Sequence, residues 1–236
     1  MVATRMQLIY LHGIAGGPAL SPAMTSLAAD GYDVIAPRLP GFAGQPGFQA
    51  PHDHLEWLTR VWDVLDETGA LPCPVIGASI GGMFAAELAI FRPEAVTKVA
   101  LLAPLGISDA ADLGIDLYAT PGSRRLSTLF AGSVPTPFET AFAELGDEQG
   151  VARYLTQVAG ASLVWPIPDR DLDLRIHRIR QPSLVLWGSE DKIAPVSLAT
   201  RWARDGSAVI VDNAGHLLEW DAPEFVGEQL RQFISE

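Results

Sequence analysis

Apolar residues in this chain fall into two alternating patterns. Short runs rich in Val, Ile and Leu predict buried strands, and they lie at residues 6–11, 34–36, 74–77, 99–103, 183–187 and 208–211. Between these runs, apolar residues recur every three or four positions and predict helices at about 22–29, 81–91 and 196–204, and from 223 onward. Because strands that alternate with helices pair in parallel, the pattern predicts an α/β fold with a mainly parallel sheet and helices on both faces.

One further helix is predicted after a loop. Residues 38–51 are rich in Gly and Pro, which favours irregular backbone. Asp53 can cap the helix that follows this loop. The expected apolar face of that helix consists of Leu55, Leu58, Val61, Trp62 and Leu65.

The alternation stops between residues 106 and 175, where no clear strand is visible and the helical stretches are short. Large apolar side chains remain frequent there, among them Leu117, Leu129, Phe138, Phe142, Tyr154 and Trp165. A disordered linker would lack such residues. We therefore expect residues 1–105 and 176–236 to form one core, and residues 106–175 to form a helical cap inserted into it.

Composition excludes several classes of partner. Of the 236 residues 48% are hydrophobic, which is ample for a large core, and 28 acidic against 16 basic residues give a formal charge of −12. Such a surface repels phosphate backbones and anionic lipid headgroups, so we expect neither nucleic acid nor a membrane as partner. No secretory signal and no apolar run of membrane-spanning length is visible, and a cytoplasmic protein is expected.

Metal and nucleotide cofactors are not expected either. Cys73 is the only cysteine, so neither an intramolecular disulfide nor a cysteine-based metal cluster can form. The histidines are dispersed, without the spacing of a metal site. Gly13, Gly16 and Gly17 lie in a glycine-rich turn, but the Lys-Ser/Thr of a phosphate-binding loop is missing.

The candidate chemistry centres on Ser79 in the pentapeptide Gly77-Ala78-Ser79-Ile80-Gly81. A strand is predicted to end at Gly77 and a helix to begin just after Ser79. On so tight a turn a serine is held in strained backbone geometry, and its hydroxyl projects beyond the edge of the sheet. The alternative is a serine that only caps the helix.

These residues, together with Leu11–Gly17 after the first strand and Val185–Pro195 near the predicted fifth strand, resemble the α/β-hydrolase superfamily over nearly the whole chain. Trp165-Pro166 and residues 174–188 resemble its small-esterase and carbon–carbon bond hydrolase branch. Most members begin with a β-hairpin that this chain is too short to hold before residue 6. The resemblance therefore implies a six-stranded core without that hairpin. Its exposed edge could pair with a second copy of the chain, which is why we consider a homo-oligomer.

The resemblance also implies where the base lies. A serine hydroxyl needs a base to become nucleophilic, and in this fold an acid and then a histidine follow the serine along the chain. Only His177 and His216 follow Ser79. His177 lies between arginines, whose charge disfavours proton uptake. His216 follows the last predicted strand, where the family carries its catalytic histidine.

The acid is expected just after the fifth strand, where Glu190 and Asp191 both qualify. The family spacing to Pro195 favours Asp191, and ordinary loop capping is its alternative explanation. Asp109, after the fourth strand, is the site that some family members use instead.

The remaining site residues follow from position. The backbone N–H groups of Ile14 and Ile80 are expected to form the oxyanion hole. His12 is given a structural role that fixes its loop, and His52 and His54 are expected to be solvated. Trp165 is expected either to line a substrate pocket or to fill the core of the cap.

Together these features predict a serine hydrolase that cleaves a small, mainly apolar carboxylic ester without a cofactor. In this hypothesis Ser79 is the nucleophile, His216 the base and Asp191 the group that orients the base. Two alternatives remain open. One is a carbon–carbon bond hydrolase that acts on a diketone-type substrate, and the other is a non-hydrolytic member of the fold that binds a small molecule.

Overall fold

The computed structural model describes residues 5–17, 19–42, 49–166, 169–203 and 206–236. Six strands form its single sheet: β1 (Gln7–Leu11), β2 (Asp33–Ile35), β3 (Cys73–Ala78), β4 (Val96–Leu102), β5 (Ser183–Gly188) and β6 (Val209–Val211). Their order is β2-β1-β3-β4-β5-β6, and every neighbouring pair is parallel. The predicted six-stranded α/β fold is therefore confirmed.

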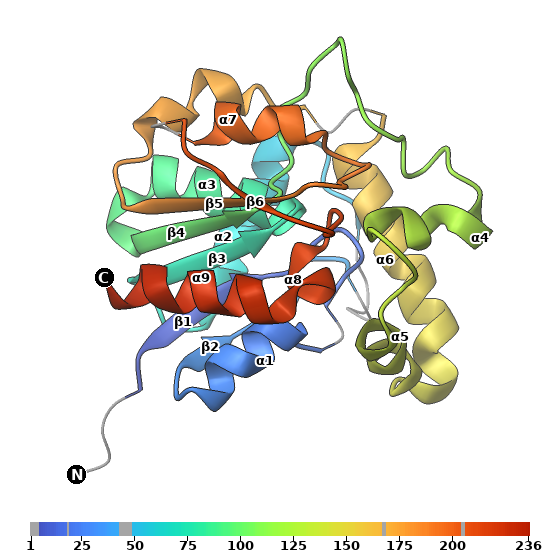
Figure 1. Cartoon of the computed structure of the whole chain (residues 1–236), viewed down its shortest axis with the longest axis horizontal. Coiled ribbons are helices and arrows are strands. Elements are labelled where there is room, and N and C mark those ends of the chain that lie inside the picture. Colours follow the sequence, from blue (N-terminus) through green and yellow to red (C-terminus); the bar gives the residue numbers. More distant parts are fainter. Residues whose placement is uncertain (1–4, 18, 43–48, 167–168, 204–205) are drawn as a thin grey trace.

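Helices cover both faces of the sheet (Figure 1). The helix α1 (Pro22–Ala29) packs with α8 (Leu218–Asp221) and α9 (Pro223–Ser235) on one face. On the other face, α3 (Ile80–Phe91) packs against α2 (His54–Glu67) and contacts β1, β3 and β4. The remaining helix of the core, α7 (Ala199–Trp202), packs beside β5.

The segment between β4 and β5 holds α4 (Gly122–Arg125), α5 (Thr136–Ala143) and α6 (Gln149–Val164). Figure 1 shows these three helices grouped beyond one end of the sheet. The segment contacts loops that leave the carboxyl ends of the strands, because Leu217 N–H donates to Leu129 O at 3.1 Å and Ile115 N–H donates to Lys192 O at 2.7 Å. That residues 106–175 form a separate helical cap remains a prediction.

Local sequence explains where two helices begin, and one expected apolar position is wrong. Ser21 accepts from Met24 N–H and caps α1, and Asp53 accepts from Glu56 N–H and caps α2 as predicted. The predicted face of α2 is wrong at Leu55, which is 64% exposed, while Trp57 takes its place in the core. Leu55 is the second residue of α2, in its first turn.

Boundaries differ from the predictions where short elements adjoin. The helix expected at 196–204 consists of a 3-10 turn, Val196–Leu198, followed by α7. The short helix α8 was not predicted, because four residues are too few for a helical period to show. Residues 43–48 of the predicted loop at 38–51 lie outside the described part of the chain.

The junction of β3 and α3 depends on two glycines at which backbones touch. A Cβ atom on Gly77 would lie 2.3 Å from Gly81 O, and one on Gly81 would lie 2.2 Å from Leu11 O. Side chains are therefore excluded at both positions. The absence of Cβ atoms is what allows α3 to start directly against β1 and β3.

We expect Gly77→Ala to destabilise the fold by about 3 kcal/mol or more, since the opposing atoms are backbone and cannot move aside. Urea unfolding would measure the loss. Gly122→Ala is the matched control, because a Cβ there meets nothing within 4 Å. Equal stability of the two variants would contradict the role given to the Gly77 contact.

Candidate active site

Ser79 lies between β3 and α3 in a strained conformation. Its backbone angles are φ 55° and ψ −118°, a region that side-chain-bearing residues rarely adopt. Its N–H donates to Leu102 O at 2.8 Å, which ties the turn to the end of β4. Backbone strain of this kind persists where the surrounding structure enforces it, and it is common at functional sites.

The structure brings Ser79, His216 and Asp191 into one chain of hydrogen bonds. The distance from His216 Nε2 to Ser79 Oγ is 2.8 Å, and that from His216 Nδ1 to Asp191 Oδ2 is also 2.8 Å. The three residues follow β3, β6 and β5, so parallel strands deliver them to the same edge of the sheet. The side chains of His216 and Asp191 have no exposed surface, and Ser79 is completely buried.

The tautomer of His216 follows from its partners. The second oxygen of Asp191, Oδ1, accepts from the N–H groups of Ile193 and Ala194, each at 2.9 Å, which fixes the carboxylate. A carboxylate facing Nδ1 favours the proton on that nitrogen, so the lone pair of Nε2 points at the Ser79 hydroxyl. This arrangement suits proton transfer from serine to imidazole.

The expected anion-binding amides also lie at this turn. Within the described part of the chain, the N–H groups of Ile14 and Ile80 have no hydrogen-bond acceptor. A Cβ atom on Gly13 would lie 3.2 Å from the Cβ of Ser79, so the absence of a side chain lets the loop after β1 approach the serine. Ile80 is the first residue of α3, whose dipole favours negative charge at this end.

Asp221, which sequence reasoning missed, fixes the loop that carries His216. Its Oδ2 accepts from Gly215 N–H at 2.8 Å and from Ala131 N–H at 2.9 Å. Burial raises the pKa of this carboxyl, while the two N–H donors act in the opposite direction. A carboxylate just before Pro223, where a helix was predicted to begin, suggests a capping residue. Its bond to Ala131, 90 positions away, has no sequence signal.

His12 is buried and neutral, in keeping with a structural role. Its Nε2 accepts from Leu39 N–H at 3.1 Å, and its Nδ1 lies 2.9 Å from Gly13 O. Burial lowers the pKa of the imidazole from 6.5 to about 4. His12 thereby connects the loop after β1 to the loop after β2.

The alternative acids and bases lie elsewhere. Asp109 accepts from the N–H of Ala111 within its own turn. The side chains of Glu190 and His177 are exposed. None of the three is hydrogen-bonded to His216.

The expectation that His54 is solvated is wrong. His52 is exposed, but the Nε2 atom of His54 lies 2.8 and 2.9 Å from the two carboxylate oxygens of Glu87, which is 1% exposed. Arg175 also reaches Glu87, at 3.4 Å. A buried carboxylate in α3 requires such partners, and only the tertiary structure reveals which residues supply them.

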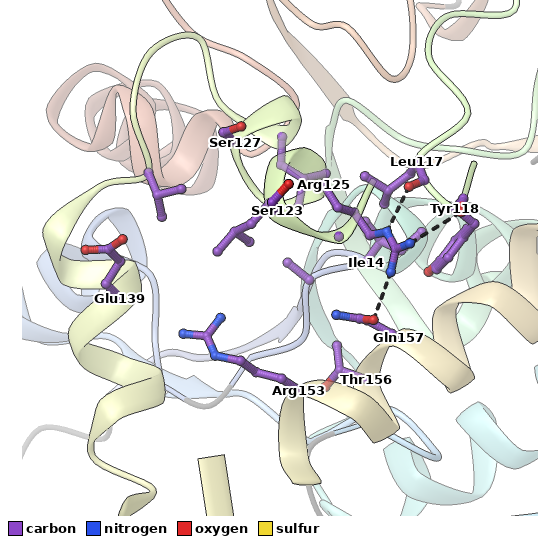
Figure 2. A pocket seen from close by; sticks show the side chains of 15 residues that line it. Ile14, Leu117, Tyr118, Ser123, Arg125, Ser127, Glu139, Arg153, Thr156 and Gln157 are labelled. Carbon is purple, nitrogen blue, oxygen red and sulfur yellow. Dashed lines mark hydrogen bonds between the residues drawn. The ribbon is translucent and has the colours of Figure 1, made fainter. Parts of the chain in front are cut away.

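Two cavities lie between the segment that follows β4 and the loop after β1. The larger, about 370 Å³, is shown in Figure 2, and the smaller has about 300 Å³. Both are lined by Ile14, Leu117 and Tyr118. Ile14 follows Gly13, which approaches Ser79, so both cavities reach the loop next to the serine, although Ser79 itself lines neither of them.

Polar side chains distinguish the larger cavity. In Figure 2 the guanidinium of Arg153 points from α6 toward Glu139 on α5. Arg125 instead stabilises the wall of this cavity. It donates to the carbonyl groups of Leu117, Tyr118 and Thr120 and to Gln157 Oε1. The lining therefore combines an apolar floor with charge at one side.

The smaller cavity is mainly apolar, and Trp165 lines it. Its other lining side chains include Leu105, Leu113, Ile115, Val164 and Ile193. Trp165 is 58% exposed, so it does not belong to the core of the predicted cap. Whether it contacts a substrate is taken up below as a proposal.

The sheet order, the strained serine and the hydrogen-bonded histidine and aspartate define the class as hydrolases of the α/β fold. Residues 8–229 match the sequence pattern of the family described as "Alpha/beta hydrolase family". The chain therefore belongs to the alpha/beta hydrolase family.

Individual relatives have low sequence identity to this chain. The chain is 28% identical over 224 residues to the dihydrolipoyllysine-residue acetyltransferase component of the acetoin cleaving system of Cupriavidus necator, covering 91% of this chain but only 59% of that relative. It is 26% identical over 246 residues to the 2-hydroxymuconate semialdehyde hydrolase of Pseudomonas putida, covering 97% of this chain and 86% of the relative.

A solved structure, the 2-hydroxy-6-oxo-6-phenylhexa-2,4-dienoate hydrolase from Rhodococcus sp. strain RHA1, superposes with a TM-score of 0.75. The match covers 98% of this chain and 91% of that one at 22% identity, and it shows that the two share a fold. Among the described residues, no helix is long and apolar enough to cross a membrane. In the same residues no group of three or more His, Cys, Asp or Glu side chains is placed to hold a metal ion.

We expect the free energy of unfolding to depend on pH through His12. Its folded pKa of about 4 lies below the unfolded value of 6.5, so the unfolded chain takes up the proton first. The contribution of neutral His12 to the free energy of unfolding is therefore fully present above pH 6.5. It is lost as the pH falls from 6.5 to 4, by roughly 3 kcal/mol in total. Urea unfolding of the wild type and of His12→Gln across this range would measure the difference in slope. Parallel curves would contradict the buried neutral state.

Proposed function

We propose that this protein is a serine hydrolase that cleaves a small, mainly apolar carboxylic ester through an acyl-enzyme. One observation carries the proposal: the 2.8 Å contacts that link Ser79 Oγ to His216 and His216 to Asp191. A serine hydroxyl is a weak nucleophile at neutral pH, and this arrangement supplies the base and fixes the base's tautomer.

The first half of the reaction forms the acyl-enzyme. His216 Nε2 takes the proton of the Ser79 hydroxyl as Oγ attacks the ester carbonyl carbon. The carbonyl oxygen becomes an oxyanion, which the N–H groups of Ile14 and Ile80 stabilise. As the tetrahedral intermediate collapses, His216 donates its proton to the alcohol that leaves, and Asp191 stabilises the imidazolium throughout.

The second half repeats these steps with water. His216 removes a proton from a water molecule as it attacks the acyl carbon, and the carboxylic acid is released when Ser79 recovers its proton. None of these steps needs a metal or another cofactor. The apolar lining of the smaller cavity, including Trp165, supports an apolar acyl or alcohol group.

A second candidate is hydrolysis of a carbon–carbon bond in a diketone-type compound. The similarity to 2-hydroxymuconate semialdehyde hydrolase and to 2-hydroxy-6-oxo-6-phenylhexa-2,4-dienoate hydrolase favours it, since these names denote oxo compounds rather than esters. The charged side of the larger cavity, at Arg153, would suit an anionic group of such a substrate.

We expect Ser79→Ala to abolish covalent labelling by a fluorophosphonate, because the probe reacts only with an activated serine. Ser162→Ala is the matched control, since that hydroxyl donates to Ala159 O within α6 and takes no part in the contacts of His216. Mass spectrometry of the intact protein would measure both. A fully labelled Ser79→Ala chain would refute the assignment. Absence of labelling in the wild type, together with tight binding of a small molecule, would favour the non-hydrolytic alternative.

Side-by-side assays separate the two hydrolytic candidates. An ester hydrolase should turn over a short-chain p-nitrophenyl ester with a kcat/KM at least about tenfold above that for a vinylogous diketone acid. Arg153→Gln should lower turnover of the anionic diketone more than that of the neutral ester. The reverse order of kcat/KM would establish carbon–carbon bond cleavage as the better assignment.

A further inference from the structure

The helix α6 contacts the loop after β1, which carries one of the two proposed oxyanion donors. Thr156 and Gly160 lie about one helical turn apart on α6, and both are buried. A Cβ atom on Gly16 would lie 3.1 Å from Cγ2 of Thr156, and one on Gly160 would lie 3.2 Å from Cγ1 of Ile14. The loop that contains Ile14 and Gly16 is therefore packed against one face of α6.

Gly160 is an unfavourable residue for the interior of a helix, because glycine loses more backbone freedom on folding than alanine does. Its position in α6 is explained by Tyr118. A Cβ atom on Gly160 would overlap the hydroxyl oxygen of Tyr118 and would lie 3.3 Å from its Cζ. The missing side chain makes room for Tyr118 beside Ile14, and Figure 2 shows these two residues side by side in the cavity wall.

The direction of the Ile14 N–H group depends on how this residue is packed. The group has no hydrogen-bond acceptor in the described part of the chain, so no bond within that part fixes it. The loop itself is a turn, in which Gly16 N–H donates to Gly13 O at 3.0 Å. The side chain of Ile14 is only 3% exposed, and it is the part of this residue that contacts α6 at Gly160.

We propose that Gly160 is a positioning residue for the hydrolytic reaction: the space left by its missing side chain seats Tyr118 beside Ile14, and this contact keeps the Ile14 N–H directed at the oxyanion. The inference rests on the proposed function. It gives the segment between β4 and β5 a second role, because the helix that lines the larger cavity also fixes one oxyanion donor. The negative charge exists only after Ser79 has attacked, so a displaced donor weakens binding of the transition state and leaves binding of the ester nearly unchanged.

The test uses the full-length chain and variants of this contact. Gly160→Ala places a methyl group against the hydroxyl of Tyr118 and against Ile14. Gly150→Ala is the matched control, because it makes the same change in the same helix at a position where a Cβ meets nothing within 4 Å. Tyr118→Phe removes the oxygen that the new methyl group would overlap. The double variant therefore measures whether relief of that overlap restores activity, and urea unfolding checks that each variant is folded.

In Gly160→Ala we expect kcat to fall about tenfold and KM to change by less than about twofold, since the weakened interaction forms only in the transition state. The loss should be equal for p-nitrophenyl acetate and p-nitrophenyl hexanoate, because both esters place the same oxyanion at the Ile14 N–H. Adding Tyr118→Phe should restore kcat to within about threefold of the wild type. The NMR signal of the Ile14 amide should move in Gly160→Ala and stay in place in Gly150→Ala.

An unchanged kcat in folded Gly160→Ala would overturn the proposal. A loss restricted to the hexanoate ester, or one that consists of a higher KM, would also overturn it, because the methyl group would then act on the cavity wall alone. If Gly160→Ala does not fold, Ile14→Ala decides, since it removes the contacting Cγ1 atom and keeps the N–H. In that variant kcat should again fall about tenfold for both esters, and an unchanged kcat would contradict the inference.

Failure of the inference and failure of the proposed function are distinguishable. Absence of fluorophosphonate labelling in the wild type would count against the proposed function. An Ile14 amide signal that is the same in the wild type and in Gly160→Ala, with normal labelling of both, would count against the inference alone.

Discussion

The close approach of α3 to β1 and β3 is the constraint on which the rest of the structure depends. Gly77 and Gly81 let backbone atoms meet where any side chain would collide, and the turn between them forces Ser79 to φ 55°. The same contact places the start of α3 next to the loop after β1. Ser79 and the N–H groups of Ile14 and Ile80 are therefore positioned by contacts between main-chain atoms.

The remaining groups reach this turn from loops that are themselves fixed by hydrogen bonds. Asp221 holds the backbone before His216 and also holds Ala131, and His12 connects the loops after β1 and β2. Each of these side chains joins segments far apart in the sequence. The edge of the sheet at which Ser79 lies is thus a network of polar contacts, whereas its interior is apolar.

The sequence could predict those features of the structure that depend on residues close together along the chain. Strand and helix periodicity depends on neighbouring residues, and so do the caps at Ser21 and Asp53 and the glycines around Ser79. The pairing of Glu87 with His54 depends on how α3 packs against α2, and the bond from Tyr10 to Glu219 depends on how α8 packs near β1. Leu55 shows the same limit, because its spacing fits the buried face of α2 and yet its side chain is exposed.

Candidate site residues divide in the same way. Ser79 was selected by the glycine motif around it, and His216 and Asp191 by the resemblance to the family; the structure brings the three side chains together. The cavities depend on how α4, α5 and α6 pack against the core, and the weak periodicity of this segment leaves that packing undetermined. The expectation of only short helical stretches there is wrong for α6, which has 16 residues. The polar lining at Arg153 and the wall formed by Tyr118 could therefore be recognised only in three dimensions.

Arg125 has a consequence for how this scaffold can change its selectivity. One guanidinium gathers the carbonyl groups of Leu117, Tyr118 and Thr120, stacks 5.8 Å from the Tyr118 ring and bonds to Gln157 on α6. Arg125 thus holds the backbone of Leu117 and Tyr118, which line both cavities. These hydrogen bonds lie within the segment between β4 and β5, so a substitution of Arg125 would change the walls of both cavities without touching the contacts among Ser79, His216 and Asp191. Substitutions in the cavity walls can in this way change the substrate range of related proteins without any change to the reaction chemistry.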